Sequence, residues 1–314
     1  MPTRTAVATA VSAVFCLVSG AVVPASAAPS TIPYDPAIGE STTLNVRYLR
    51  VTANDRRPDP VVSVDYELEL RVTERQDDRF LAEVRNQRTN VTVNRQRVLA
   101  PPDFDSLLLL AIDGMTAELE MTDQGALVSV SNWDNLRQPL IDKAVRLAGD
   151  DETLVETART FLPDIDAESA VQVFARPLVI SAPGRMVAFD PPERRAAEAR
   201  DAAIPGFANA RGRWSFDLLP RSPLPDSVTV QWLGVPATES LRAVLEPLRD
   251  RLARINPDND DTLATIEADG RMWQRFSATY DDETGQLLAF QGAMELTAGP
   301  LQRRVAIEAA AMGR

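Results

Sequence analysis

The chain has 314 residues, a formal net charge of -12 at pH 7, a single Cys and no His. The lack of His excludes Ser-His-Asp and Cys-His catalysis and nearly all catalytic zinc, copper and non-haem iron sites. The acidic balance disfavours nucleic acid and anionic membrane surfaces as partners. A chain of this length, with 45% hydrophobic residues, can bury an ordinary core without disulfides.

The first 27 residues have the three parts of a cleavable secretion signal. Arg4 precedes an apolar run, Ala6–Val23, and an Ala-Ser-Ala sequence occupies positions 25–27. A positive start, an apolar middle and small residues at the end are what the export and cleavage machinery require. A retained anchor is the alternative, but spanning usually takes about 20 strongly apolar residues and this Ala-rich run has about 18. We expect an exported, periplasmic or secreted, soluble protein of a bacterial cell envelope, without the signal and its Cys16.

The first strands of the mature chain show period-2 patterning. Residues 28–41 are Pro-rich and predicted to form an extended leader, followed by an N-terminal α+β half at 42–189. Within it, even-numbered residues from Val62 to Val72 are apolar and the odd-numbered ones are polar, which is typical of a half-solvated antiparallel strand. Further strands are expected at 44–51, 80–85, 91–95, 115–121 and 126–131, and residues 107–112 fit a core strand or the start of a buried helix.

Helical patterns follow in the same half. The first is expected at 136–148, with Asp134 as N-cap and Gly149 at its end, and others at 152–162 and after Asp166. The Pro-rich residues 190–212 are predicted to connect this half to a C-terminal α+β half at 213–314.

The C-terminal half repeats the order of a strand followed by an amphipathic helix. Strands are expected at 214–218 and 228–232, a helix at 241–255, and three more strands at 271–280, 286–296 and 302–310. Together the patterns predict an α+β fold of meandering antiparallel, curved, half-barrel-like sheets with a few amphipathic helices packed on one face. They leave open whether the halves are similar by duplication, and whether they share one sheet or form two domains.

The chemistry-bearing candidates are few. The Asp-Asn-Asp-Asp sequence at 258–261 begins like a calcium loop, but Leu263 stands where the loop needs Gly, so a turn before a strand at 263–267 is predicted. Carboxylates are the remaining catalytic option, yet Glu67 and Glu69 fall on the charged face of their strand and are interpreted as a solvated exterior. We predict no catalytic, cofactor-binding or metal-binding residue and no cofactor.

One aromatic residue stands out from the predicted core. Trp273 and Arg275 fall on the polar face of their strand, with Ser277 and Thr279, and are the candidate ligand or partner surface. The leading hypothesis is a non-catalytic exported binding protein that holds an apolar or lipid-like molecule between sheet and helices. The alternatives are an envelope assembly protein that uses an exposed apolar patch or sheet edge to bind another protein, and a carboxylate-only hydrolase.

Overall fold

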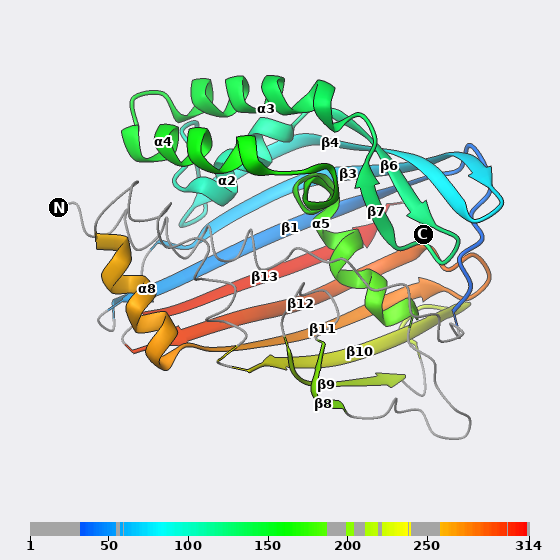
Figure 1. The fold of residues 1–314 in the computed structure, drawn as a ribbon. Helices are drawn as coiled ribbons and strands as arrows, with labels where there is room; N and C mark the ends of the chain where they lie inside the picture. The colour runs from blue at the N-terminus through cyan, green and yellow to red at the C-terminus, as the bar shows by residue number, and fades with distance from the viewer. Residues whose placement is uncertain are drawn as a thin grey trace.

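The computed structural model describes residues 32–54, 57–58, 60–186, 199–203, 211–218, 222–237, 239, 258–299 and 301–312. The expected signal peptide, the helix at 241–255 and most of the connection at 190–212 lie outside these residues. The described residues form an α+β structure, as predicted, in which helices pack on one face of a broad antiparallel sheet that does not close (Figure 1).

The sheet has 13 strands within the described residues. Their order is β7-β6-β4-β3-β1-β13-β12-β11-β10-β9-β8, and the two-residue strands β2 and β5 pair with β1 and β4. The strands are β1 (Ser41–Asn54), β2 (Arg57–Pro58), β3 (Val62–Gln76), β4 (Arg79–Val93), β5 (Gln96–Arg97), β6 (Thr116–Thr122), β7 (Leu127–Val130), β8 (Ala199–Ala203), β9 (Arg211–Leu218), β10 (Ser227–Pro236), β11 (Arg271–Asp281), β12 (Leu287–Ala298) and β13 (Leu301–Ala311). The helices are α2 (Phe104–Ile112), α3 (Trp133–Ala148), α4 (Glu152–Phe161), α5 (Ala167–Met186) and α8 (Asp258–Asp269), with a 3₁₀ turn at Leu162–Asp164.

The two halves share one sheet, which answers the question that the sequence left open. Strand β1 lies between β3 and β13, so the first long strand pairs with the last. Their antiparallel register runs from Leu44 opposite Ala311 to Ala53 opposite Gln302. This pairing joins the N-terminal and C-terminal halves through backbone hydrogen bonds.

Strand β4 differs from the prediction, which divided it into two segments. It is one strand of 15 residues. Residues 85–90 are a polar run without clear alternation, and the register against β3 shifts between Asp65 and Glu67, where Arg88 has a φ of 58°. A bulge of this kind adds a residue to one strand and breaks the period of two, and the break concealed the strand's continuity.

Two helix predictions needed correction, and one open alternative is decided. Residues 107–112, which fitted a core strand or the start of a buried helix, belong to the buried helix α2. Helix α3 begins at Trp133, so its N-cap residue is Asn132 and not Asp134. The Asn132 side chain does not cap the helix, because its Oδ1 accepts the backbone N–H of Glu118. Residues 263–267 lie inside helix α8 rather than in a strand. The turn at Gly125 and the helix end at Gly149 are confirmed, each with positive φ (74° and 59°).

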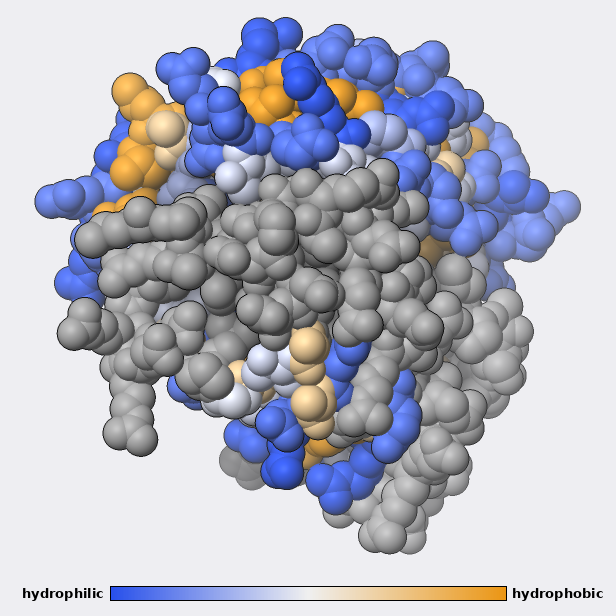
Figure 2. All heavy atoms as spheres, turned by 60° about the vertical axis from the view of Figure 1, so that its left-hand side comes forward, coloured by the Kyte–Doolittle hydropathy of each residue, from blue (hydrophilic) through white to orange (hydrophobic). Residues whose placement is uncertain are grey.

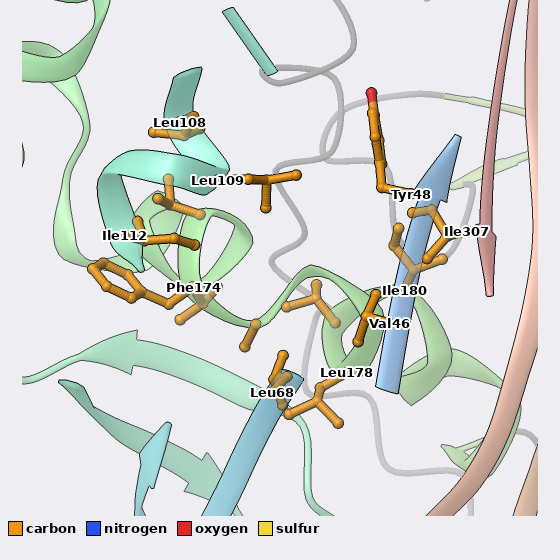
Figure 3. Packing of buried hydrophobic residues seen from close by; sticks show 14 of the residues in the cluster. Val46, Tyr48, Leu68, Leu108, Leu109, Ile112, Phe174, Leu178, Ile180 and Ile307 are labelled. Atoms are coloured by element: carbon orange, nitrogen blue, oxygen red, sulfur yellow. The ribbon is translucent and has the colours of Figure 1, made fainter. Parts of the chain in front are cut away.

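The apolar face of the sheet is continuous across eight strands. One row of side chains on this face follows the strand pairing from β9 to β4: Phe216, Trp232, Phe276, Gly292, Ile307, Tyr48, Val64 and Val91. All the non-Gly members are buried, with exposed fractions of at most 3%. Helices α2 and α5 pack over this face, where Leu178 and Ile180 of α5 lie beside Leu68, Val46 and Ile307 of β3, β1 and β13 (Figure 3). Helix α5 also crosses β10, β11 and β12, where Gly184 lies against Trp232 and Tyr280.

The alternation along β3 provides a direct test of the layer assignment. Leu68 is 0% exposed and Glu69, one residue later, is half-buried on the opposite face. Leu68→Asp buries an unpaired carboxylate and is expected to lower the unfolding free energy by several kcal/mol, enough to unfold a typical domain. Glu69→Gln is the matched control and is expected to change it by about 0.5 kcal/mol or less. Urea unfolding of both variants measures the contrast, and equal losses would contradict the assigned faces.

Candidate functional site

An aromatic cluster occupies the apolar face on strands β9 to β12. The Phe216 and Trp232 rings stack with centroids 5.6 Å apart, and Phe276 lies 5.4 Å from both Trp232 and Phe290. Gly292 leaves room for this packing, since a Cβ there would lie 2.1 Å from Phe276 Cδ1. The cluster therefore makes a wholly apolar region of packed rings on this face, with exposed fractions of at most 3%, and Gly184 of α5 lies against the Trp232 ring.

Two indole groups, that of Trp232 in the cluster and that of Trp214 next to Phe216, have unmet hydrogen-bonding capacity. The Nε1 atoms of Trp214 and Trp232 are buried, and neither has a hydrogen-bond partner among the described residues. Buried Trp N–H groups usually find an acceptor, because leaving one unmet costs about 1–3 kcal/mol. An apolar surface with two unmet donors suits a ligand that is mostly hydrocarbon and carries an acceptor oxygen.

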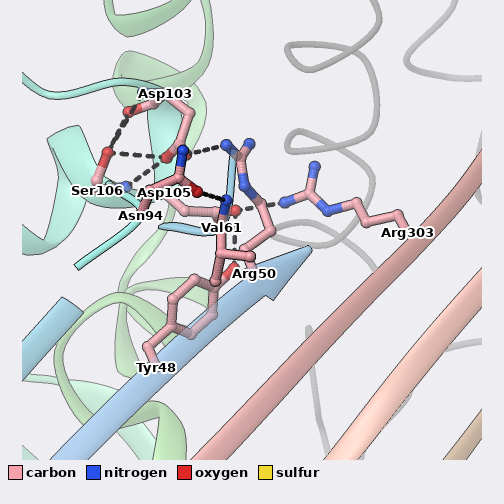
Figure 4. Close-up of polar contacts among 8 residues, drawn as sticks. All are labelled: Tyr48, Arg50, Val61, Asn94, Asp103, Asp105, Ser106 and Arg303. Atoms are coloured by element: carbon pink, nitrogen blue, oxygen red, sulfur yellow. Dashed lines mark hydrogen bonds and ion pairs between the residues drawn. The ribbon is translucent and has the colours of Figure 1, made fainter. Parts of the chain in front are cut away.

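A buried ion-pair network lies further along the same face, where helix α2 meets strands β1 and β13 (Figure 4). Arg50 Nη2 lies 2.5 Å from Asp103 Oδ2, and Arg303 Nη2 lies 2.5 Å from Asp105 Oδ2. The Tyr48 hydroxyl donates to the same Asp105 oxygen at 2.8 Å. All of these side chains are buried, with exposed fractions between 0% and 6%. The network ties the helix layer to the sheet.

The local sequence explains how these groups come together. Tyr48, Arg50 and Thr52 alternate along β1, so all three point to the apolar face. Arg303 stands opposite Thr52 on β13. Asp103 is the N-cap of α2 and forms a capping box with Ser106, which fixes the start of the helix above these strands.

Arg50 is only partly satisfied by this network. One of its terminal nitrogens meets Asp103, while Nε and Nη1 are buried without a partner among the described residues. The Thr52 hydroxyl, two residues further along the strand, also has none. On the helix side, both amide atoms of Gln172 in α5 are buried and unmet. Buried polar groups in native proteins are nearly always satisfied, so such a set requires an explanation.

A third Arg holds the opposite end of the interface between helices and sheet. Arg185 of α5 donates to the carbonyls of Gln124, Gly125 and Gly285, and its guanidinium lies 4.3 Å from the Tyr34 ring centroid. Burial lowers the pKa of Arg185, and the charge interactions with Tyr34 and Tyr280 oppose this shift. These bonds join α5 to the β6–β7 turn and the β11–β12 turn. Beside them lies a small pocket of about 30 Å³, room for one water.

The polar face of the sheet carries an open groove of about 1010 Å³. It crosses β3, β1, β13, β12, β11 and β10 and is lined by ion pairs and hydroxyls. Glu67 belongs to it: its side chain is only 14% exposed, because Arg88 Nη1 lies 2.7 Å away, so Glu67 is not the freely solvated residue that the sequence suggested. Arg47 and Asp65 form a second pair in the groove at 2.7 Å.

The two residues predicted as a contact surface lie on this polar face but outside the groove. Trp273 is half-buried opposite Glu295 of β12, and Arg275 is exposed opposite Ala293. Ser277 and Thr279, further along β11, line the groove. The structure thus places Trp273 and Arg275 on the face that was expected, and leaves their role a prediction.

The surface and the helices add two negative observations. No helix in the described part of the chain is long and apolar enough to cross a membrane. Large exposed apolar side chains are scattered over different elements: Ile38, Leu99, Val128, Leu224 and Met312. In the view of Figure 2 the described surface is mostly hydrophilic, with small apolar areas between charged side chains.

Comparison with known proteins gives no family. No family model and no curated protein sequence matches the chain. Among solved structures it is similar to lipovitellin, in a structure that describes lipid–protein interactions, with 6% identity and a TM-score of 0.45 over 88% of this chain; the match spans a quarter (25%) of the lipovitellin chain.

Two bacterial structures match over more of their own length but with lower scores. An exported protein of Bacteroides fragilis with a YmcC-like fold is 9% identical, with a TM-score of 0.16 over 88% of this chain and 97% of that one. A lipoprotein of Parabacteroides distasonis is 6% identical, with a TM-score of 0.14 over 89% and 98%. All three scores are below 0.5, so none of these likenesses carries an argument.

The tyrosines make a testable prediction about alkaline stability. All four tyrosines of the chain are buried, and burial raises the pKa of Tyr34, Tyr66 and Tyr280 above the ordinary value of 10.0. The folded state therefore keeps these hydroxyls protonated while the unfolded state ionises near pH 10. Their contribution to stability is complete below pH 10 and declines as the pH rises above it, by about 1.4 kcal/mol per pH unit for each such tyrosine.

Tyrosinate absorbance recorded together with circular dichroism measures this effect. The native protein is expected to show little tyrosinate between pH 10 and 11 until it unfolds. Tyr280→Phe removes one titrating group and is expected to flatten the alkaline decline by one tyrosine's share, although it also loses the hydrogen bond to the Ser181 carbonyl. A full titration near pH 10 in the folded protein would show that these hydroxyls reach water.

Proposed function

We propose that this protein is an exported, non-catalytic binding protein of the cell envelope that holds an apolar or lipid-like molecule between the sheet and the helices. The observation that carries the proposal is the aromatic surface of Phe216, Trp232, Phe276 and Phe290 with its two unmet indole donors. Ligand sites are mostly apolar, with a few placed polar groups that fix orientation, and this surface has that composition.

The buried carboxylates favour binding over catalysis. They are Asp103, Asp105 and Asp281. The first two are held in ion pairs with Arg50 and Arg303, and Asp281 accepts the backbone N–H and hydroxyl of Thr284 in a turn. Each of these three has a structural partner. Hydrolysis of a glycosidic bond needs a pair of carboxylates facing a cleft, and of the carboxylates that line the polar groove, Asp65 and Glu67 are held in ion pairs with Arg47 and Arg88.

The interaction-protein alternative has a separate basis, the polar groove. Its paired charges and its hydroxyl ladder, in which Ser222, Thr229 and Thr279 lie within 2.8 Å of one another in turn, suit a polar partner and not an apolar one. The sheet edges offer less, since β7 and β8, the outermost strands in the described residues, are four and five residues long.

Two measurements test the proposal. Protein purified from its native envelope is expected to release an apolar molecule on organic extraction and mass analysis. The ligand-free protein is expected to bind a neutral long-chain monoacylglycerol with a change in tryptophan fluorescence. Trp232→Phe removes one donor and is expected to weaken that binding about fivefold, the share of a typical hydrogen bond.

Trp273→Phe is the matched control, because it makes the same change on the polar face. It is expected to leave the affinity for monoacylglycerol unchanged. A protein that carries no apolar molecule, fails to bind the probe and instead retains a stable protein partner would overturn the proposal in favour of the interaction protein.

A further inference from the structure

We propose that the polar groove is a second binding site and that its ligand is a neutral oligosaccharide. This inference goes beyond the proposed function and does not rest on it, because the groove lies on the face of the sheet opposite the aromatic cluster. Its basis is a hollow of about 1010 Å³ that crosses six strands and is lined mostly by polar side chains.

Small residues and a side wall give the groove its shape. Two cross-strand rows of side chains line it: Gln231, Ser277, Gln291, Glu308, Arg47 and Asp65 in the first, and Thr229, Thr279, Ala289, Ala310, Asn45 and Glu67 in the second. In the second row Ala289 and Ala310 stand between longer side chains, so the floor is low there. Ser222 Oγ lies 2.8 Å from Thr229 Oγ1, and this contact holds residues 222–223 beside the floor as a wall.

The hydrogen-bonding groups of the groove match those of a sugar. Gln231, Ser277 and Gln291 are consecutive members of the first row, on β10, β11 and β12, and their side chains have no hydrogen-bond partner within the described part of the chain. An amide or a hydroxyl group both donates and accepts hydrogen bonds, as each hydroxyl of a sugar does. Three such groups at the strand spacing of about 4.8 Å therefore offer a series of matched contacts to a chain of sugar units.

The charges of the groove favour a neutral ligand over an ion. The described lining carries the guanidinium groups of Arg47 and Arg88 and the carboxylates of Asp65, Glu67 and Glu308. Arg47 is paired with Asp65 and Arg88 with Glu67, each at 2.7 Å. An anion would have to displace one of these carboxylates and would also meet Glu308. A cation is not favoured either, because Glu308 stands opposite Arg47 in the strand pairing.

The length and composition of the groove favour a sugar chain over a protein. From β3 to β10 there are five strand spacings, roughly 24 Å at about 4.8 Å each, which leaves room for several sugar units. Protein partners bind mainly through a few large aromatic or Arg anchors in well-packed, desolvated pockets. Among the described lining residues that point to this face, the apolar ones are Ala289, Ala310 and Pro223, which are too small to form such an interface core.

Isothermal titration calorimetry of the full mature protein with neutral sugar chains tests the inference. The probes are maltohexaose, laminarihexaose and mannohexaose, which differ in linkage and sugar but carry no charge. At least one is expected to bind with a Kd of about 1 mM or tighter, and hexagalacturonate, an anionic chain of the same length, is expected to bind about tenfold more weakly or less. Absence of binding by all three neutral chains would overturn the inference, and so would tighter binding of the anionic chain.

Variants in the groove locate the site. Gln291→Ala removes one amide and is expected to weaken sugar binding about fivefold, the share of a typical hydrogen bond. Ala310→Trp fills the floor and is expected to abolish measurable binding. Gln302 lies on the same face of β13 but outside the groove, so Gln302→Ala and Gln302→Trp are the matched controls and are expected to have no effect. If neither groove variant changes the affinity while its circular dichroism remains that of the folded protein, the groove is not the site.

Two cross-checks separate this site from the apolar one. Trp232→Phe, on the opposite face, is expected to leave the affinity for the sugar unchanged, and Gln291→Ala is expected to leave monoacylglycerol binding unchanged. Failure of sugar binding therefore leaves the proposed function standing, and failure of monoacylglycerol binding leaves the groove standing. A protein partner that the wild-type chain retains and Ala310→Trp loses, with no sugar bound by either, would assign the groove to a protein contact and overturn the inference.

Discussion

The constraint on which this structure depends is that a sheet with one apolar face has to have that face covered. The alternation along β1, β3 and β13 directs every second side chain to the same side across the strand pairing, and eight strands contribute to a single row. Helices α2 and α5 meet this need over β3, β1 and β13, and α5 also does so over part of β10, β11 and β12. The helices are in turn held at fixed points, by the Arg50 and Arg303 ion pairs at one end and the Arg185 bonds at the other.

The sequence predicted the features that depend on local patterns. The period of two in Val62–Val72 was enough to assign β3 and its faces, and Gly125 and Gly149 marked a turn and a helix end through the positive φ that Gly tolerates. Predictions were wrong where tertiary contacts override the pattern. The bulge at Arg88 hid the continuity of β4. The start of α3 was predicted with Asp134 as N-cap, but the helix begins earlier, after Asn132, whose side chain bonds to β6.

The candidate site was missed for a related reason. Arg50 and Asp103 are 53 positions apart and Arg303 lies 198 residues beyond Asp105, so no local spacing brings them together. A signal did exist: Arg50 continues the alternation of Val46 and Tyr48, and a charged residue in phase with apolar ones predicts a buried charge that needs a partner. Trp273 drew attention instead because it is out of phase with its apolar neighbours, a feature that a partly covered sheet also produces.

A purely structural role for the Arg50–Asp103 pair leaves part of it unexplained. Replacing a buried ion pair by apolar residues is often neutral or stabilising, because removing two charges from water costs about as much as their attraction returns. Anchoring α2 to β1 thus does not require an Arg at this position, and it uses only the Nη2 side of the guanidinium. The Nε and Nη1 atoms of Arg50 are buried without a partner among the described residues, and the anchoring of α2 does not explain them.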